Sequence, residues 1–258
     1  MSNLLLSTEQ IADFNRDGYV IARGFYNENE IQRLQDAAFN DDSLNANAWH
    51  KKDAKGAVSK VCLWQKPGDD LYGMFSRGKR LVESCEAILG EPVYHTSTKI
   101  MMKEPFVGGA WEWHQDFGYW HRDNYQLYPL LVSCMVAINK ATIENGCLQV
   151  LKGSHHIGRI DHNKTGDQKG ADLEFVNEAM KHHELINVEL EPGDVLFFHC
   201  NLLHKSNQNQ SAEPRWSMIS AYNAMRNVSF KENEAVYHPL EKVEDSAILE
   251  WAPTEESV

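Results

Sequence analysis

The sequence predicts a mainly β protein with flanking helices, in which the strands form a sandwich or jelly roll. Helical patterns dominate up to Pro92, whereas short runs rich in β-branched and aromatic residues dominate after it. Turn-forming pairs such as Asn145-Gly146 and Pro192-Gly193 separate many of these runs. Helices first and many strands afterwards are typical of a jelly roll with helices packed outside it.

The length and composition fit one globular domain. The chain has 258 residues, of which 42% are hydrophobic and 24% are charged, close to the averages of globular proteins. We expect a single domain over residues 1–258. Within it we expect a helical flank with edge strands over 1–92, a jelly-roll catalytic core over 93–226 and a C-terminal extension over 227–258.

The helices expected before Pro92 follow from capping signals. A capping-box pattern at Ser7 begins the first helix, and Gly18 can end it. A strand over 19–21 follows, then a second helix from near Asn27 with apolar positions Ile31, Leu34 and Ala38, and a third helix from the cap Asp70 to Leu89. The polar stretch 44–56 is expected to be a mobile loop.

The expected strands lie in the second part of the chain. They cover residues 93–102, 130–138, 147–151, 185–190, 194–199 and 216–224. The polar segment 161–172 interrupts them, and its centre at 166–170 has the composition of a surface insertion. Because lids over binding sites are usually long polar segments, both 44–56 and 161–172 are candidate lids.

Charge and cysteine content exclude several classes of function. The formal net charge of −12 argues against nucleic-acid and membrane-surface partners, because acidic proteins repel phosphate groups. No apolar run approaches the roughly 18 residues that span a bilayer, and no signal peptide is recognisable. Five scattered cysteines argue against a disulfide framework and a structural zinc site. We expect a soluble, cytoplasmic protein, and the sequence leaves its oligomeric state open.

The segment His114-Gln115-Asp116 has the residue types of a metal site. If it forms a strand, His114 and Asp116 point to the same face and can hold one ion together. An imidazole and a carboxylate suit iron(II), whose facial triad needs one further histidine. The similar pattern at 121–123 is expected to be a polar turn. The third ligand should come from a distant strand, and both His199 and His204 are candidates.

Two residues beyond His204 have side chains suited to binding a carboxylate. Ser206 follows two residues later and Arg215 eleven residues later. An arginine near a metal-binding histidine provides a fork for a carboxylate, and a serine hydroxyl can add a hydrogen bond. This spacing therefore indicates a metal site with an adjoining carboxylate anchor.

Several motifs in this order resemble the phytanoyl-CoA dioxygenase family. They span roughly residues 93–226 and comprise His114-x-Asp116, the turn at Gly146, Gly153-Ser154-His155, Gly193-Asp194 with Phe198-His199, His204-x-Ser206 and Arg215. Members of this family are iron(II)- and 2-oxoglutarate-dependent oxygenases on a double-stranded β-helix, a cupin-like jelly roll. The resemblance implies hydroxylation of a small-molecule metabolite with O2 and decarboxylation of 2-oxoglutarate to succinate, with ascorbate as a support in vitro.

The resemblance also implies roles for individual residues. His114, Asp116 and His204 would bind iron. Arg215 would pair with the distal carboxylate of 2-oxoglutarate, assisted by Ser206. Further neighbours of the cosubstrate are implied at Lys99, Ser133 and Lys60. Related halogenases replace the carboxylate ligand with a small residue, so the presence of Asp116 favours hydroxylation.

Two other functions remain open from the sequence. A jelly-roll hydrolase or isomerase could hold zinc in the same three-ligand site, but it would not need the dicarboxylate anchor at Arg215. A catalytically silent 2-oxoglutarate-binding protein would bind the cosubstrate without forming succinate. The absence of a basic cluster in the sequence favours a small free metabolite over a CoA thioester, although Arg159 is a candidate contact to an anion.

Overall fold

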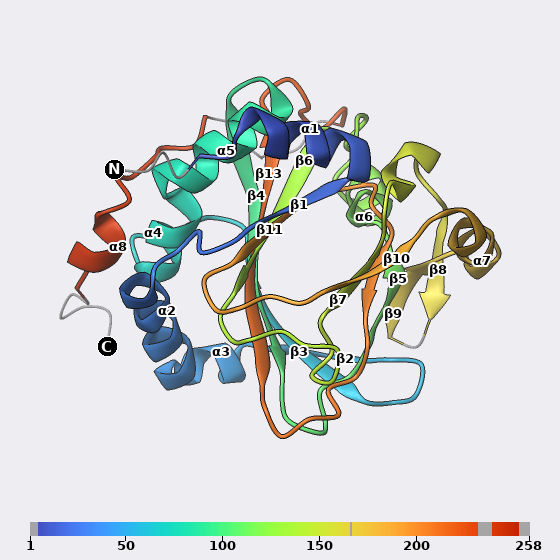
Figure 1. Ribbon diagram of the computed structural model, residues 1–258, viewed down its shortest axis with the longest axis horizontal. Helices are drawn as coiled ribbons and strands as arrows, with labels where there is room; N and C mark the ends of the chain where they lie inside the picture. Colours follow the sequence, from blue (N-terminus) through green and yellow to red (C-terminus); the bar gives the residue numbers. More distant parts are fainter. Residues whose placement is uncertain (1–4, 166, 232–238, 253–258) are drawn as a thin grey trace.

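Two facing antiparallel sheets form the centre of the computed structural model, which describes residues 5–165, 167–231 and 239–252 (Figure 1). The larger sheet has seven strands, in the order β1 (Tyr19–Ala22), β11 (Val195–His199), β6 (Leu131–Ala137), β13 (Arg215–Ala224), β4 (Val93–Lys103), β3 (Val58–Trp64) and β2 (Trp49–Lys52). The smaller sheet has four, in the order β10 (Leu185–Val188), β7 (Leu148–Leu151), β12 (His204–Ser206) and β5 (Trp111–His114). The predicted jelly roll is confirmed.

Side chains of the larger sheet alternate between two hydrophobic layers. On β11, Val195 and Phe197 pack toward the helices, whereas Leu196 and Phe198 pack in the layer between the two sheets. Three of the seven strands, β1, β2 and β3, precede Val93. The sheet therefore extends beyond the expected core limits of 93–226.

Helices cover the outer face of the larger sheet (Figure 1). The helices of the chain are α1 (Thr8–Asp17), α2 (Glu28–Asn40), α3 (Asp42–Ala46), α4 (Leu71–Arg77), α5 (Lys79–Leu89), α6 (Asp116–Asp123), α7 (Leu173–His182), α8 (Ala247–Glu250) and the 3₁₀ turn η1 (Ser154–Ile157). Capping boxes at Ser7 and Asn27 begin α1 and α2 as predicted, and Gly18 ends α1 at φ 82°. In the part of the chain that the structure describes, no helix has the length and apolar character to cross a membrane.

The helix predicted from Asp70 to Leu89 is in fact two helices, broken at Gly78. Gly78 has an extended conformation, and the next backbone N–H, that of Lys79, donates to the carbonyl of Val243. The carboxylate of Asp245 accepts from the backbone N–H of Arg80. The C-terminal segment thus supplies partners for the start of α5, a long-range contact that local sequence signals do not reveal.

Both candidate lids contain regular structure. Residues 44–56 were predicted as a loop, but they include the end of α3 and the edge strand β2. This strand is mostly exposed, so it lacks the apolar alternation by which strands are recognised. The polar segment 161–172 forms a hairpin of β8 (His162–Thr165) and β9 (Gln168–Ala171), which lies with α7 at the end of the molecule opposite α2 (Figure 1).

Candidate metal and cosubstrate site

Two neighbouring strands and one helix start bring the predicted metal ligands together. His114 is the last residue of β5 and pairs directly with His204 of β12. Asp116 is the first residue of α6, so the expectation that it shares a strand with His114 is wrong. Gln115 connects the two elements, and its side-chain amide donates to the carbonyls of Gly158 and Asn201. These bonds stabilise the turn that directs the Asp116 carboxylate toward the histidines.

The three side chains form one buried cluster. The potential ligand atoms of His114, Asp116 and His204 all lie within 4.8 Å of one another. From Oδ1 of Asp116, Nε2 of His114 is 3.7 Å away and Nε2 of His204 is 3.9 Å away. Each of the three residues is only 3% exposed. Two imidazole nitrogens and one carboxylate on one side of a common point are the donor set of a facial triad.

Backbone contacts orient both imidazole rings. Nδ1 of His114 lies 2.7 Å from the carbonyl of Glu112, and Nδ1 of His204 lies 2.9 Å from the carbonyl of Leu202. In the tautomer that these carbonyls select, Nδ1–H donates and Nε2 keeps a free lone pair. Burial lowers the pKa of both histidines below its usual value, and for His114 the field of His204 lowers it further. Both rings are therefore neutral, as metal ligands must be.

Ser133 touches the carboxylate of the cluster. Its hydroxyl donates to Oδ2 of Asp116 at 2.7 Å, and the serine is 1% exposed at the centre of β6. Because Ser133 holds Oδ2, Oδ1 remains directed toward the two histidines. The structure thus gives Ser133 a direct contact with the expected metal ligand.

Arg215 lies at the start of β13 as a buried cation. Its guanidinium donates to the carbonyl of Gly146 at 2.9 and 3.2 Å and to the hydroxyl of Ser217 at 3.3 Å. Burial lowers its pKa to about 10, so it is still charged at neutral pH. Among the described residues it makes no ion pair with a carboxylate. A buried charge without a counter-ion is costly and indicates a place for an anionic ligand.

One cavity connects the histidines with this cation. It is lined by Lys99, Met101, Trp111, His114, Met135, Leu148, Phe198, His204, Ser206, Arg215 and Ile219. Lys99 and Ser206, two predicted neighbours of the cosubstrate, therefore share the cavity with Arg215. The charge of Lys99 also acts on both ligand histidines. The lining thus combines two imidazoles with a guanidinium, the groups that a dicarboxylate bound to a metal and to a cation needs.

Lys60 lies outside this cavity. Its ammonium group is 3.4 Å from a carboxylate oxygen of Glu104 and 3.2 Å from the side-chain carbonyl of Asn45. Lys60 belongs to β3, two strands away from β13 in the larger sheet. The structure therefore brings Lys99, Ser206 and Arg215 together but leaves Lys60 apart from them.

Two residues near the site, the buried Lys103 and the half-buried His162, were not foreseen from the sequence. Lys103 is fully buried opposite Arg215 in the register of β4 and β13, and its ammonium donates to the carbonyl of Asn207. Burial and the positive field of Arg215 lower the pKa of Lys103 well below its usual value. His162 of β8 accepts a hydrogen bond from the backbone N–H of Gln115 at 2.9 Å, between the two ligand positions. Lys103 follows Lys99 by four residues, so on a strand both side chains point to the same face, and this spacing could have identified Lys103. No local signal marks His162.

Comparison with known proteins agrees with this geometry. The family model of phytanoyl-CoA dioxygenase matches residues 14–217. The chain is 28% identical over 239 residues to the ectoine dioxygenase of Sphingopyxis alaskensis, covering 86% of this chain and 77% of that protein. It is 30% identical over 183 residues to the L-proline trans-4-hydroxylase of Streptomyces griseoviridis, covering 62% of this chain and 65% of that protein.

A solved structure extends the similarity to three dimensions. The crystal structure of EctD from S. alaskensis with 2-oxoglutarate and 5-hydroxyectoine superposes with a TM-score of 0.77 at 25% sequence identity. The match covers 93% of this chain and 88% of that chain. The similarity therefore extends over nearly the whole chain.

Proposed function

The chain belongs to the phytanoyl-CoA dioxygenase family and is an iron(II)- and 2-oxoglutarate-dependent oxygenase that hydroxylates a small molecule; from this we propose the residues that carry the reaction. His114, Asp116 and His204 bind the iron. Arg215 binds the distal carboxylate of 2-oxoglutarate, with Ser206 and Lys99 as neighbours in the same cavity.

The donor set fits iron(II). Two neutral imidazoles and a carboxylate are buried together, and the second nitrogen of each imidazole is engaged by a backbone carbonyl. When bound, iron(II) supplies O2 activation, coupled to oxidation of 2-oxoglutarate to succinate and CO2 and to hydroxylation of the substrate. The protein orients the ligands, excludes water from the cavity and pairs Arg215 with the cosubstrate.

The observation that carries this proposal is the buried guanidinium of Arg215, which has no ion-pair partner among the described residues and lies in the cavity that also holds the two histidines. A zinc hydrolase has no use for such an anchor, because its metal site needs only an open position for water. A dicarboxylate bound at one end by a cation and at the other by a metal uses both features of the cavity.

The thiols support a proposal for the compartment. All five cysteines are free, and the Sγ atoms of Cys85 and Cys134 lie 3.3 Å apart without a bond between them. Free thiols in such proximity are typical of reducing conditions. We therefore propose a cytoplasmic location.

Succinate formation tests the function. The purified protein is given iron(II), ascorbate and 2-oxoglutarate under air, alongside Asp116→Ala and the control Asp36→Ala, which removes an exposed carboxylate on α2. We expect succinate from the wild type and from Asp36→Ala, and none from Asp116→Ala. An anaerobic titration for the metal-to-cosubstrate charge-transfer band accompanies the assay.

The other candidate functions give different results. Turnover of esters or other hydrolysable compounds with zinc and without 2-oxoglutarate would indicate the hydrolase. A charge-transfer band without succinate, even in a broad screen of metabolites, would indicate the silent binding protein. If the wild type shows no charge-transfer band and forms no succinate, the proposal is contradicted.

A further inference from the structure

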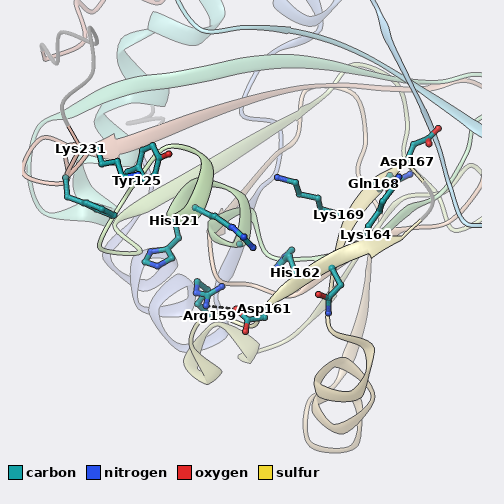
Figure 2. Close-up of a pocket in the computed structure, with 14 residues that line it drawn as sticks. His121, Tyr125, Arg159, Asp161, His162, Lys164, Asp167, Gln168, Lys169 and Lys231 are labelled. Carbon is teal, nitrogen blue, oxygen red and sulfur yellow. Dashed lines mark hydrogen bonds and ion pairs between the residues drawn. The ribbon is translucent and has the colours of Figure 1, made fainter.

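A second and larger cavity lies beside α6, the helix that begins at Asp116. It has a volume of about 990 Å3 and opens between α6, the β8–β9 hairpin and residues 230–231. Figure 2 shows Tyr125 and Lys231 on one side of it and Lys164 with Gln168 on the other, and His162 and Lys169 lie between them. We call this cavity the basic basin.

The charge of the basic basin is opposite to that of the whole chain. Among the residues that the structure describes, its lining contains five basic side chains, Arg122, Arg159, Lys164, Lys169 and Lys231, and two acidic ones, Asp161 and Asp167. The chain as a whole has 25 basic and 37 acidic residues. The basic residues are spread over 110 positions of sequence, so no basic cluster is visible until the chain folds. A concave site with an excess of one sign of charge concentrates ligands of the other sign.

Three of these cations, Arg122, Lys164 and Lys231, have no ion-pair partner within the described residues, and Lys231 lies over the ring of Tyr125 at 3.9 Å from its centroid. Arg159 is paired with Asp161 at 2.6 Å, and Lys169 with Asp123 at 2.8 Å. Arg122, at the end of α6, and Lys164, on β8, line the basin without such a contact. Within the described part of the lining, the acids therefore do not neutralise the cations, and Arg122 and Lys164 remain available as donors to an oxyanion.

The basic basin adjoins the metal site through His162. This histidine lines the basin, and its Nε2 accepts from the backbone N–H of Gln115, which lies between the two ligands His114 and Asp116. The ring of Tyr119 bridges the two regions, with its centroid 5.5 Å from that of His114 and 5.5 Å from that of His162. A molecule seated in the basin thus lies one layer of side chains from the proposed iron.

We propose that the basic basin binds an oxyanion of the substrate, and that the substrate is a small metabolite bearing a carboxylate, phosphate or phosphonate group. This inference rests on the proposed function, because it assigns the basin to the substrate of that oxygenase. Arg122 and Lys164 bind the oxyanion directly, and the paired Arg159 and Lys169 add to the positive field around it.

Direct binding of simple ions tests the proposal. The holoenzyme is loaded anaerobically with iron(II) and saturating 2-oxoglutarate, so that Arg215 is occupied, and is titrated calorimetrically with methylphosphonate, acetate and tetramethylammonium. The test variant is Arg122→Gln with Lys164→Gln. The control variant is Lys79→Gln with Lys140→Gln, which also removes two exposed cations but leaves the basin intact.

We expect the wild type and the control to bind methylphosphonate or acetate, and tetramethylammonium to show no binding. The test variant should bind the anion at least about tenfold more weakly, because charge-assisted contacts are lost. Tighter binding of methylphosphonate would assign a phosphate or phosphonate, and tighter binding of acetate a carboxylate. Equal anion affinity in the test and control variants, tetramethylammonium binding, or no anion binding by the wild type would overturn the inference.

The same samples separate this inference from the proposed function. A charge-transfer band in the test variant shows that its metal and cosubstrate site is intact. Absence of the band in the wild type would count against the proposed function alone, since the anion titration still reports on the basin. If the double variant does not fold, Lys164→Gln alone provides the comparison, because Lys164 is exposed on the hairpin.

Discussion

Ser133→Ala distinguishes a metal-site role for this serine from the role of cosubstrate neighbour that the family resemblance implies. The hydroxyl donates to Oδ2 of Asp116 at 2.7 Å, and the two residues are 1% and 3% exposed. A hydrogen bond to a charged group contributes about 1.5–3 kcal/mol. Loss of a contact that orients a metal ligand weakens metal binding by roughly 10- to 100-fold. We expect Ser133→Ala to weaken iron(II) binding by a factor in that range.

The assay separates the metal from the cosubstrate. Anaerobic titration gives the iron(II) affinity, and initial rates of succinate formation at saturating iron give the KM for 2-oxoglutarate. Ser220→Ala is the matched control, because Ser220 is 2% exposed on the adjacent strand and bonds to Thr98, away from Asp116. It should leave the iron(II) affinity unchanged.

Two results would refute the reasoning. If Ser133→Ala keeps the wild-type iron(II) affinity, the contact with Asp116 does not orient the ligand. If Ser133→Ala instead raises the KM for 2-oxoglutarate with iron binding unchanged, the serine serves the cosubstrate, as the resemblance implies. Co(II) binding followed by absorbance gives an independent check that does not depend on turnover.

Three further predictions follow from placement and burial. Arg215→Ala should raise the KM for 2-oxoglutarate about 30-fold or more, with Arg215→Lys recovering part, because truncating one partner of a buried charge pair costs about 2–5 kcal/mol; an unchanged KM would make the residue structural. Lys60→Ala should change the KM for 2-oxoglutarate less than about twofold, because Lys60 contacts Glu104 outside the cavity. A larger rise of this KM in succinate assays would show that Lys60 serves the cosubstrate. Burial lowers the pKa of His199 to about 3, so between pH 6.5 and 5 only the unfolded state takes up its proton. Between these two pH values, protonation of His199 in the unfolded state should therefore lower the free energy of unfolding by about 1.5 kcal/mol. In urea denaturation, the decrease for His199→Gln should be smaller than that of the wild type by this amount. Identical pH profiles of the two proteins would contradict the prediction.

Local signals in the sequence determined the parts of the molecule that depend on neighbouring residues. The caps at Ser7 and Asn27 satisfy backbone N–H groups within three residues, so α1 and α2 begin where a short pattern predicts. Mainly apolar runs likewise identify β6 and β11, because most side chains of a strand buried on both faces are apolar. The spacing between His204 and Arg215 is also visible in the sequence, and it indicated a carboxylate anchor near a metal-binding histidine.

Tertiary structure decided everything that depends on pairing between distant segments. The register of β5 and β12 brings His204 beside His114, and the contact of α6 with β6 gives Asp116 its partner Ser133. The sequence contains both members of each pair but not their separation in space, because sheet register arises from the packing of all strands together.

The basic basin shows the same division most clearly. Its cations occur singly in an acidic chain, so composition predicts no anion-binding surface. Folding places α6 and the β8–β9 hairpin against one cavity, and electrostatic potential depends on distance in space and not along the chain. The sequence by itself therefore identified the chemistry at the iron, whereas only the tertiary structure revealed the charge of the surface beside it.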